Sequence, residues 1–132
     1  MTKKAQLKKR KSYQWGVVAE WLCVLYLILK GYRVLARRFK CKSGEIDLIA
    51  QKGAMICFIE VKARKKIQDA LMALSFRQQQ RIIKAAEWYL ARNIYGKNGG
   101  IEAVSCRFDL MAVEPWNLPT HVKDAWQMDV KM

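Results

Sequence analysis

Two short segments of alternating polar and apolar residues, joined by a short link, constrain the fold of this chain most strongly. The segments are residues 44–49 (GEIDLI) and 58–62 (FIEVK), and the link between them contains Gly53. Such alternation predicts β-strands, and a glycine between two strands favours a tight turn because it adopts positive φ at little cost. We therefore expect a β-hairpin over residues 44–51 and 54–63.

The register of this hairpin decides which charged side chains meet. Glu60 and Lys62 are two residues apart on one strand, so they share a face of the sheet. A link of two residues (Lys52-Gly53) or of four residues places Asp47 on that same face, whereas a link of three residues places it on the other. Since Lys52-Gly53 resembles a tight turn, we expect Asp47, Glu60 and Lys62 to converge.

Two interpretations of this cluster follow from the residues alone. Two carboxylates and an ammonium group suit the binding of a hard divalent cation and the activation of a water molecule for attack on a phosphodiester. Alternatively, Glu60 and Lys62 form the solvated face of a half-exposed strand, which is the normal origin of such alternation. Helices predicted on either side of the hairpin would cover both faces of the sheet, where a charge is costly unless it is paired or metal-bound. Both interpretations stay open at this point.

The composition indicates one packed domain with an affinity for polyanions. The chain has 132 residues, of which 52% are hydrophobic, and this excludes a disordered chain. There are 25 lysines and arginines against 11 acidic residues, a formal net charge of +14. Such a balance favours nucleic acid, the ribosome or an acidic membrane surface as a partner. Attraction to phosphates could explain this charge without any catalysis.

The cysteines and the histidine argue against a zinc site. The 4 cysteines are far apart in the sequence, and the chain has 1 histidine, His121. No C-x-x-C pair is present, so a structural zinc site is not expected. Reduced thiols fit a cytoplasmic protein. No organic cofactor is expected either.

The N-terminal region resembles a signal peptide or membrane anchor at first sight. Residues 1–12 are strongly basic, and Val17–Leu29 is apolar. The apolar stretch contains Glu20 and is shorter than the ~20 residues that a membrane span requires. We predict a mobile basic arm over residues 1–12, then a buried helix with Ser12 as its N-cap and Gly31 at its C′ position, and no membrane partner.

The rest of the chain predicts an α/β fold. Residues 13–132 are expected to form a single domain, in which 114–132 is a C-terminal tail packed through Trp116 and Trp126. A second long helix should start at Ser75, because Ser75 and Gln78 match the spacing of a capping box. The expected order is helix, three strands, helix, strand, which gives a mixed sheet of about four strands flanked by helices. The further predicted elements are a strand at 32–39, a short helical turn or part of a mobile loop at 67–73, a loop at 96–100 and a strand at 104–113.

The chain resembles the YraN-like family of small bacterial proteins, grouped with the PD-(D/E)xK nucleases of restriction-endonuclease-like fold. The resemblance covers roughly Trp15 to Val113. Its specific part is the pair of hairpin segments, 44–49 and 58–64; Gly16, Ala19-Glu20, Gly31-Tyr32 and Arg107-Phe108-Asp109 match as well.

The resemblance implies roles for four residues. In that superfamily an aspartate and the glutamate of the E-x-K motif ligate a divalent metal, and the lysine orients water or steadies the phosphorane charge; these roles fall on Asp47, Glu60 and Lys62. Some branch-cutting members use a glutamate of the first helix as a further metal ligand, which Glu20 matches. The alternative is that Glu20 reaches solvent or pairs with a nearby arginine. The proline of the motif is absent, since Ile46 precedes Asp47.

Glu45, Gln78 and Gln80 are weaker site candidates. Relatives often carry a lysine near the start of the second long helix, where this chain has glutamines, and a glutamine there could bind a metal-bound water or a phosphate. Basic residues are expected to hold the nucleic-acid backbone: Arg33, Arg37, Arg38, Arg64, Lys65, Lys66, Arg77 and Arg81.

These expectations combine into a leading hypothesis and its rivals. The leading one is a Mg²⁺- or Mn²⁺-dependent, nuclease-like protein that acts on DNA and selects branched, flapped or end-containing structures, since no base-reading motif is present. The first rival is a non-catalytic nucleic-acid-binding module whose acidic cluster is an ion-pair network. The second is an RNA- or ribosome-associated factor. Branch-cutting relatives are often dimers, so a homodimer is an option.

Overall fold

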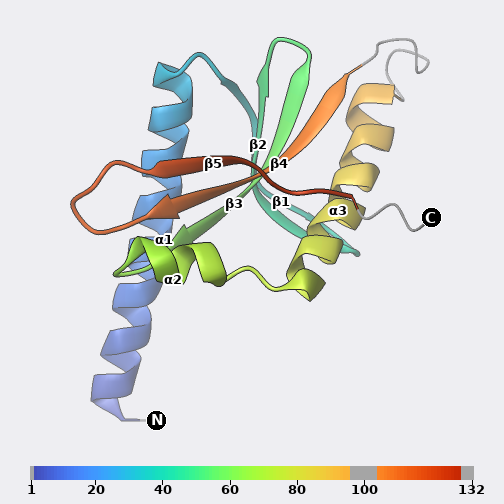
Figure 1. Ribbon diagram of the computed structural model, residues 1–132. Coiled ribbons are helices and arrows are strands. Elements are labelled where there is room, and N and C mark those ends of the chain that lie inside the picture. Colours follow the sequence, from blue (N-terminus) through green and yellow to red (C-terminus); the bar gives the residue numbers. More distant parts are fainter. Residues whose placement is uncertain (1, 96–103, 129–132) are drawn as a thin grey trace.

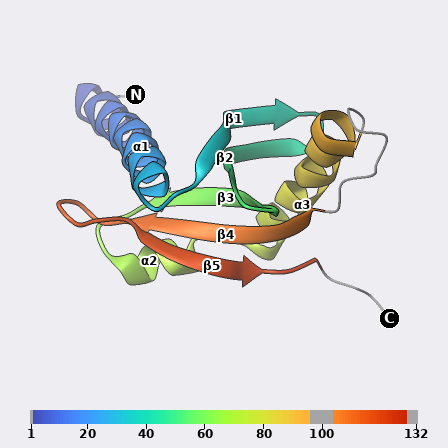
Figure 2. The same cartoon turned by 90° about the horizontal axis from the view of Figure 1, so that it is seen from above.

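The computed structural model describes residues 2–95 and 104–128, which form a mixed five-stranded sheet with helices on both faces (Figures 1 and 2). The strand order is β1-β2-β3-β4-β5, and every neighbouring pair is antiparallel except the parallel pair β3–β4. The elements are α1 (Lys3–Leu29), β1 (Arg33–Cys41), β2 (Gly44–Lys52), β3 (Met55–Ala63), α2 (Ile67–Met72), α3 (Phe76–Leu90), a π-helical turn η1 (Ala91–Tyr95), β4 (Ser105–Val113) and β5 (Thr120–Trp126).

The predicted α/β class is confirmed, but the predicted number of strands is wrong. The fifth strand, β5, lies at the edge of the sheet beside β4, and most of its residues are solvent-exposed or half-buried. An edge strand with one open side carries little hydrophobic alternation, so the sequence pattern did not reveal it. Trp126 at its end is buried as expected, whereas Trp116 is 102% exposed, so the expected packing of Trp116 is wrong.

Helix α1 starts earlier than expected. Thr2 is its N-cap and accepts a hydrogen bond from the backbone N–H of Ala5, so the predicted start at Ser12 is wrong. The basic residues near the N-terminus are therefore part of α1. The division into an arm at residues 1–12 and a domain at residues 13–132 stays a prediction. At the other end, Gly31 adopts a φ of +91°, its N–H donates to Ile28 and the N–H of Tyr32 donates to Leu27. This is a Schellman motif, which confirms Gly31 at C′.

One face of α1 packs on the sheet and the other is exposed. Ala19, Cys23 and Leu27 are fully buried, and α1 packs on β1, β2 and β3. The helix is long and apolar enough to cross a membrane by length and composition, a test that core helices of soluble proteins also pass. The prediction of a buried helix is thus confirmed for one face, because the opposite face exposes Val18, Trp21, Leu22, Leu25, Ile28 and Leu29.

The predicted hairpin is present, with its turn one residue further along the chain. Lys52 pairs with Met55, so the two-residue turn is Gly53-Ala54, and Gly53 adopts a φ of +60°. The β2–β3 ladder ends at the pair Leu48–Ile59. Beyond this pair the two strands separate, and the space between them is where Asp47 and Glu60 lie.

Helix α3 covers the opposite face of the sheet from α1 (Figure 2). The Ser75 side chain accepts a hydrogen bond from the N–H of Gln78 at 3.1 Å, which confirms the predicted N-cap. The predicted apolar stripe of α3 packs on the sheet through Ile82, Ala86 and Tyr89. This packing brings the first turn of α3 next to the separated ends of β2 and β3.

Candidate metal and nucleic-acid site

A pocket of about 510 Å³ opens where β2 and β3 separate. One wall comes from α1, and the others come from β2, from the end of β3 and from the segment that follows it. The lining residues are Trp15, Gly16, Glu20, Asp47, Glu60, Val61, Lys62, Ala63, Arg64 and Lys65. The pocket therefore contains Asp47, Glu60 and Lys62, as the hairpin register predicted, together with Glu20.

The Asp47 carboxylate takes the place of a missing strand partner. The ladder between β2 and β3 ends just before this point, and the backbone N–H of Val61 donates to Asp47 Oδ2 at 2.8 Å. Burial raises the pKa of Asp47 above its ordinary value, although the Val61 hydrogen bond acts in the opposite direction. This bond fixes the half-buried carboxylate against the β3 backbone, where its negative charge must be compensated.

Glu60 is the most strongly perturbed acid of the pocket. Its carboxyl group interacts with that of Asp47, and Lys62 Nζ lies 3.5 Å from Glu60 Oε1. Burial, and then the nearby charge of Asp47, raise the pKa of Glu60 to about 8, while Lys62 offsets part of the rise. The charged form of Glu60 is thus disfavoured beside Asp47, because Lys62 does not fully compensate the burial and the second negative charge.

Gln78 reaches the same glutamate from the opposite side of the sheet. Its backbone N–H is engaged by the Ser75 cap, and its side-chain Nε2 donates to Glu60 Oε1 at 3.2 Å. The capping-box spacing thus correctly identified Ser75 as the N-cap. The side chain of Gln78, however, hydrogen-bonds Glu60 in the pocket. Glu45 is exposed and lies with Gln78 and Arg81 at a smaller hollow of about 190 Å³. Gln80 is half-buried on α3 and is not among the residues that line the main pocket.

Glu20 lies at the rim of the pocket and is held by two arginines of β1. Glu20 Oε1 accepts from Arg38 Nε at 2.9 Å and from Arg37 Nη1 at 3.4 Å. This confirms the pairing that was the alternative to a metal-binding role, which itself stays a prediction. Arg38 adopts a φ of +54°, a conformation that non-glycine residues rarely take and that is often found at functional sites. The Arg37 guanidinium also stacks on Trp21, 4.4 Å from the ring centre.

The residues predicted to contact nucleic acid are spread over four regions. Arg64 and Lys65 line the pocket, and Lys66 follows as the exposed N-cap of α2. Arg37 and Arg38 lie at the pocket rim, bound to Glu20. The pocket and its rim thus contain the basic residues closest to the acidic pair.

The remaining three basic candidates lie elsewhere. Arg77 and Arg81 are exposed on α3, and Arg81 borders the smaller hollow. Arg33 donates to Gln51 at 3.2 Å, toward the β2–β3 turn and away from the separated strand ends. The structure therefore does not bring Arg33 to the pocket.

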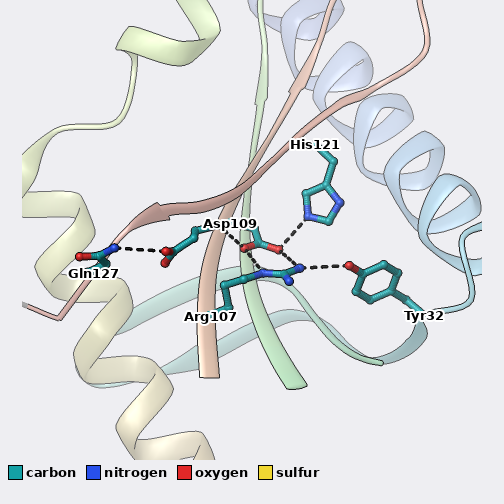
Figure 3. Close-up of polar contacts among 6 residues, drawn as sticks. Tyr32, Arg107, Asp109, His121 and Gln127 are labelled. Atoms are coloured by element: carbon teal, nitrogen blue, oxygen red, sulfur yellow. Dashed lines mark hydrogen bonds and ion pairs between the residues drawn. The ribbon is translucent and has the colours of Figure 1, made fainter. Parts of the chain in front are cut away.

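Sequence reasoning missed a second buried acidic group, Asp109 on β4 (Figure 3). Arg107 donates to both of its oxygens, at 2.8 and 2.9 Å, and His121 Nε2 lies 2.7 Å from Oδ2. The backbone N–H of Asp124 donates to Oδ1, and Arg107 also donates to the Tyr32 hydroxyl. Burial opposes ionisation, but the hydrogen bonds of His121 and Arg107 lower the pKa of Asp109 below its ordinary value. This network joins β5 and the end of α1 to the centre of the sheet.

The acidic residues of the pocket offer oxygen donors to a metal ion. Within residues 2–95 and 104–128, no group of three or more His, Cys, Asp or Glu side chains forms a ready-made metal cluster. Glu60, which is buried, and Asp47, which is half-buried, nevertheless form a pair of interacting oxygen donors whose raised pKa values indicate a deficit of positive charge. Oxygen donors suit hard cations such as Mg²⁺ and Mn²⁺. The pair therefore fits a hard divalent ion.

Comparison with known proteins gives consistent matches over most of the chain. The model of "Uncharacterised protein family UPF0102" matches residues 19–113. A UPF0102 protein of Mesorhizobium japonicum is 42% identical over 127 residues, which cover 96% of this chain and 97% of the relative. UPF0102 proteins of Rhodopseudomonas palustris BisB5 and Agrobacterium fabrum are each 47% identical, over 87% and 90% of this chain and 84% and 93% of the relatives.

Proposed function

Because this chain belongs to the UPF0102 (YraN-like) family of bacterial proteins, an uncharacterised family, we propose a function from its own pocket. The proposal is a metal-dependent, nuclease-like protein that hydrolyses phosphodiesters in nucleic acid, preferentially in branched, flapped or end-containing DNA. It would act in the bacterial cytoplasm. The order α1-β1-β2-β3-α3-β4 supports the restriction-endonuclease-like fold that the resemblance implies.

A single observation carries the proposal. Glu60, which is buried, and Asp47, which is half-buried, line one pocket as a pair of interacting carboxyl groups, with Lys62 Nζ 3.5 Å from Glu60, and the pocket opens to solvent among basic residues. A buried acidic pair costs folding free energy, and strongly perturbed acids cluster at functional sites. A structural ion pair could be placed on the surface at much lower cost.

Asp47 and Glu60 would hold the Mg²⁺ or Mn²⁺ ion, with the backbone carbonyl of Val61 and Glu20 as further oxygen donors from the same pocket. When bound, the ion would lower the pKa of a coordinated water molecule. It would also compensate the negative charge that builds up on the phosphate. The absence of sulfur and imidazole donors among the pocket-lining residues argues for a hard ion over zinc.

The chain's own residues have distinct tasks in this proposal. Lys62 places a compact positive charge beside Glu60, where it would favour the pentavalent phosphorane more than the ground state. Gln78 orients the Glu60 carboxylate through its hydrogen bond, and Val61 orients that of Asp47. These fixed orientations reduce the rearrangement that the reaction would require.

The net charge of +14 supports a nucleic-acid partner. Arg64 and Lys65 at the pocket, and Arg37 and Arg38 at its rim, would contact backbone phosphates on either side of the reacting one. Binding through many phosphates would weaken steeply with salt. No base-reading element is evident, which supports selection by structure rather than by sequence.

A second candidate, a non-catalytic nucleic-acid-binding module, is favoured by one observation. Each acid of the pair already has protein partners, namely Val61 for Asp47, and Lys62 and Gln78 for Glu60. The pair would then be a structural network beneath a basic surface. In this case Asp47→Ala should leave nucleic-acid affinity unchanged or improve it, and divalent ions should have no effect.

The discriminating experiment is cleavage of labelled duplex, single-stranded, flapped and four-way DNA, and of RNA, in Mg²⁺, Mn²⁺ or EDTA. Wild-type protein is compared with Lys62→Ala and with the matched control Lys84→Ala, an exposed lysine of α3. Metal-dependent cutting that falls by about a hundredfold or more in Lys62→Ala alone supports the nuclease. No cutting of any substrate, with tight binding that EDTA leaves unchanged, supports the binding module instead.

A further inference from the structure

Gly16 lies in the interior of α1, where glycine is unfavourable. A glycine there loses more backbone entropy on folding than alanine would, so it weakens the helix. Gly16 is not among the glycines with positive φ, and a Cβ atom built on it would meet no heavy atom of the described residues within 4 Å, apart from its chain neighbours Trp15 and Val17 and its own helix backbone. Neither backbone conformation nor packing within the protein requires a glycine at this position.

The empty space above Gly16 belongs to the main pocket. Gly16 and Trp15 line it together with Glu20, which lies one helical turn further along the same face of α1. The acidic pair, Lys62 and the basic residues Arg64 and Lys65 line the same pocket. The pocket therefore combines a charged part with a second part, here called the shelf, which is lined by Trp15 and by the helix backbone at Gly16. Trp15 also packs against the buried cluster beneath α1.

These parts match the groups of a nucleotide. Lys62, Arg64 and Lys65 suit a phosphate, the indole of Trp15 suits the flat face of a base, and the open backbone at Gly16 admits a sugar close to α1. We propose that the shelf formed by Trp15 and Gly16 seats an unpaired nucleotide next to the phosphate held at Asp47, Glu60 and Lys62. The inference rests on the proposed function and specifies its substrate as a strand that is single-stranded at the bound position.

The shape of the site explains why the nucleotide must be unpaired. A base inside a continuous duplex is stacked on both sides, so it reaches a concave pocket only after extrusion from the helix. Extrusion costs least where the base has no partner, as in a flap, a gap or a single-stranded end. Stacking on an aromatic ring accepts any base, which agrees with selection by structure rather than by sequence.

The test uses Gly16→Ala, because its two predicted effects have opposite signs. The melting temperature should rise by a few degrees, since alanine favours the helix and meets no neighbour. Affinity for a short fluorescein-labelled single-stranded DNA, measured by anisotropy with Ca²⁺ as the divalent ion, should fall about tenfold relative to wild type, and affinity for the matching duplex should change little. Val18→Leu adds bulk to an exposed position of α1 outside the pocket and should leave both affinities unchanged.

Trp15 provides an independent arm. Trp15→Leu should weaken single-strand binding about tenfold, and Trp15→Phe, which keeps an aromatic face, should recover most of it. The inference is overturned if Gly16→Ala binds the single strand as tightly as wild type, or if Trp15→Leu and Trp15→Phe bind equally.

Failure of the shelf and failure of the proposed function remain distinguishable. One outcome is that Mn²⁺ raises the melting temperature of wild type but not of Asp47→Asn, while Gly16→Ala leaves the affinity for single-stranded DNA unchanged. In that case the proposed nucleotide shelf is wrong and the metal site is supported. If Mn²⁺ has no effect while single-strand binding depends on Gly16 and Trp15, the shelf stands and the metal-dependent function is wrong.

Discussion

Gln78 Nε2 donates to Glu60 Oε1 at 3.2 Å, and this contact ties the first turn of α3 to the centre of the pocket. Ser75 caps the same turn, so the cap that starts α3 also positions the glutamine. Groups that orient a metal-binding carboxylate typically change metal affinity by 10- to 100-fold when they are removed. Gln78 is therefore the most direct link between helix geometry and the proposed chemistry.

Gln78→Ala should weaken Mn²⁺ binding about tenfold, because Glu60 loses the donor that fixes its orientation. The measurement is a calorimetric titration with Mn²⁺. Gln79→Ala, at the next position of the same helix, removes the same side chain outside the pocket lining and should bind Mn²⁺ like wild type. Equal affinities in the two variants would remove Gln78 from the site.

Asp109→Asn should lower the free energy of unfolding by about 3 kcal/mol, because Arg107 loses its charged partner in a buried network. Urea denaturation measures this change. Asp69→Asn, on an exposed residue of α2, should change it by less than about 0.5 kcal/mol. A loss in Asp109→Asn no larger than in the control would mean that the network adds no stability.

The lowered pKa of Asp109 predicts that the stability of the fold depends on pH in the acidic range. The pKa of Asp109 is lowered in the folded state from its ordinary value of 3.8, so its contribution is complete above that value and is lost as the pH falls through the folded pKa. Wild-type stability should therefore decrease as the pH falls below about 4. The decrease should be smaller in Asp109→Asn, and identical slopes of stability against pH would contradict the assignment.

Gly31→Ala should destabilise the fold by about 1 kcal/mol, because Gly31 holds a φ of +91° at the end of α1. Thermal and urea denaturation both report the change. Gly16→Ala is the matched control. It is the same substitution in the interior of α1, and it is expected to raise the stability of the fold. A stabilising Gly31→Ala would be incompatible with the Schellman motif.

Glu20→Gln separates the two roles considered for this glutamate. Its arginine partners have side chains 33% and 32% exposed, so solvent screens the pairs and stability should change by less than about 1 kcal/mol. The lost negative charge beside Asp47 should weaken Mn²⁺ binding by less than tenfold. A complete loss of Mn²⁺ binding in the titration would identify Glu20 as an essential ligand.

Local signals predicted much of the fold. Gly31, Ser75 and the glycine of the β2–β3 turn each determine the backbone of their own neighbourhood, so their roles follow from residue type and spacing. The sequence also predicted that Asp47, Glu60 and Lys62 lie together. The predicted turn and the observed Gly53-Ala54 turn both have two residues, and both place Asp47 on the same face of the hairpin as Glu60 and Lys62.

What the sequence did not predict depends on tertiary contacts. Strand β5 is stabilised by pairing with β4 and by the contacts of His121 with Asp109, neither of which leaves a local pattern. The early start of α1 was missed because Thr2 is an N-cap as suitable as Ser12. The ion pairs of Glu20 with Arg37 and Arg38 depend on where α1 packs on the sheet. The spacing of residues within the helix does not predict that position.

The most direct test of the metal site is calorimetric titration of Mn²⁺ into wild type, Asp47→Asn, Glu60→Gln and the surface control Asp69→Asn. We expect wild type and Asp69→Asn to bind Mn²⁺ with the same affinity, whereas the two pocket variants should not bind it. Absence of Mn²⁺ binding by wild type, or equal binding by Asp47→Asn, would mean that Asp47 and Glu60 do not form a metal site.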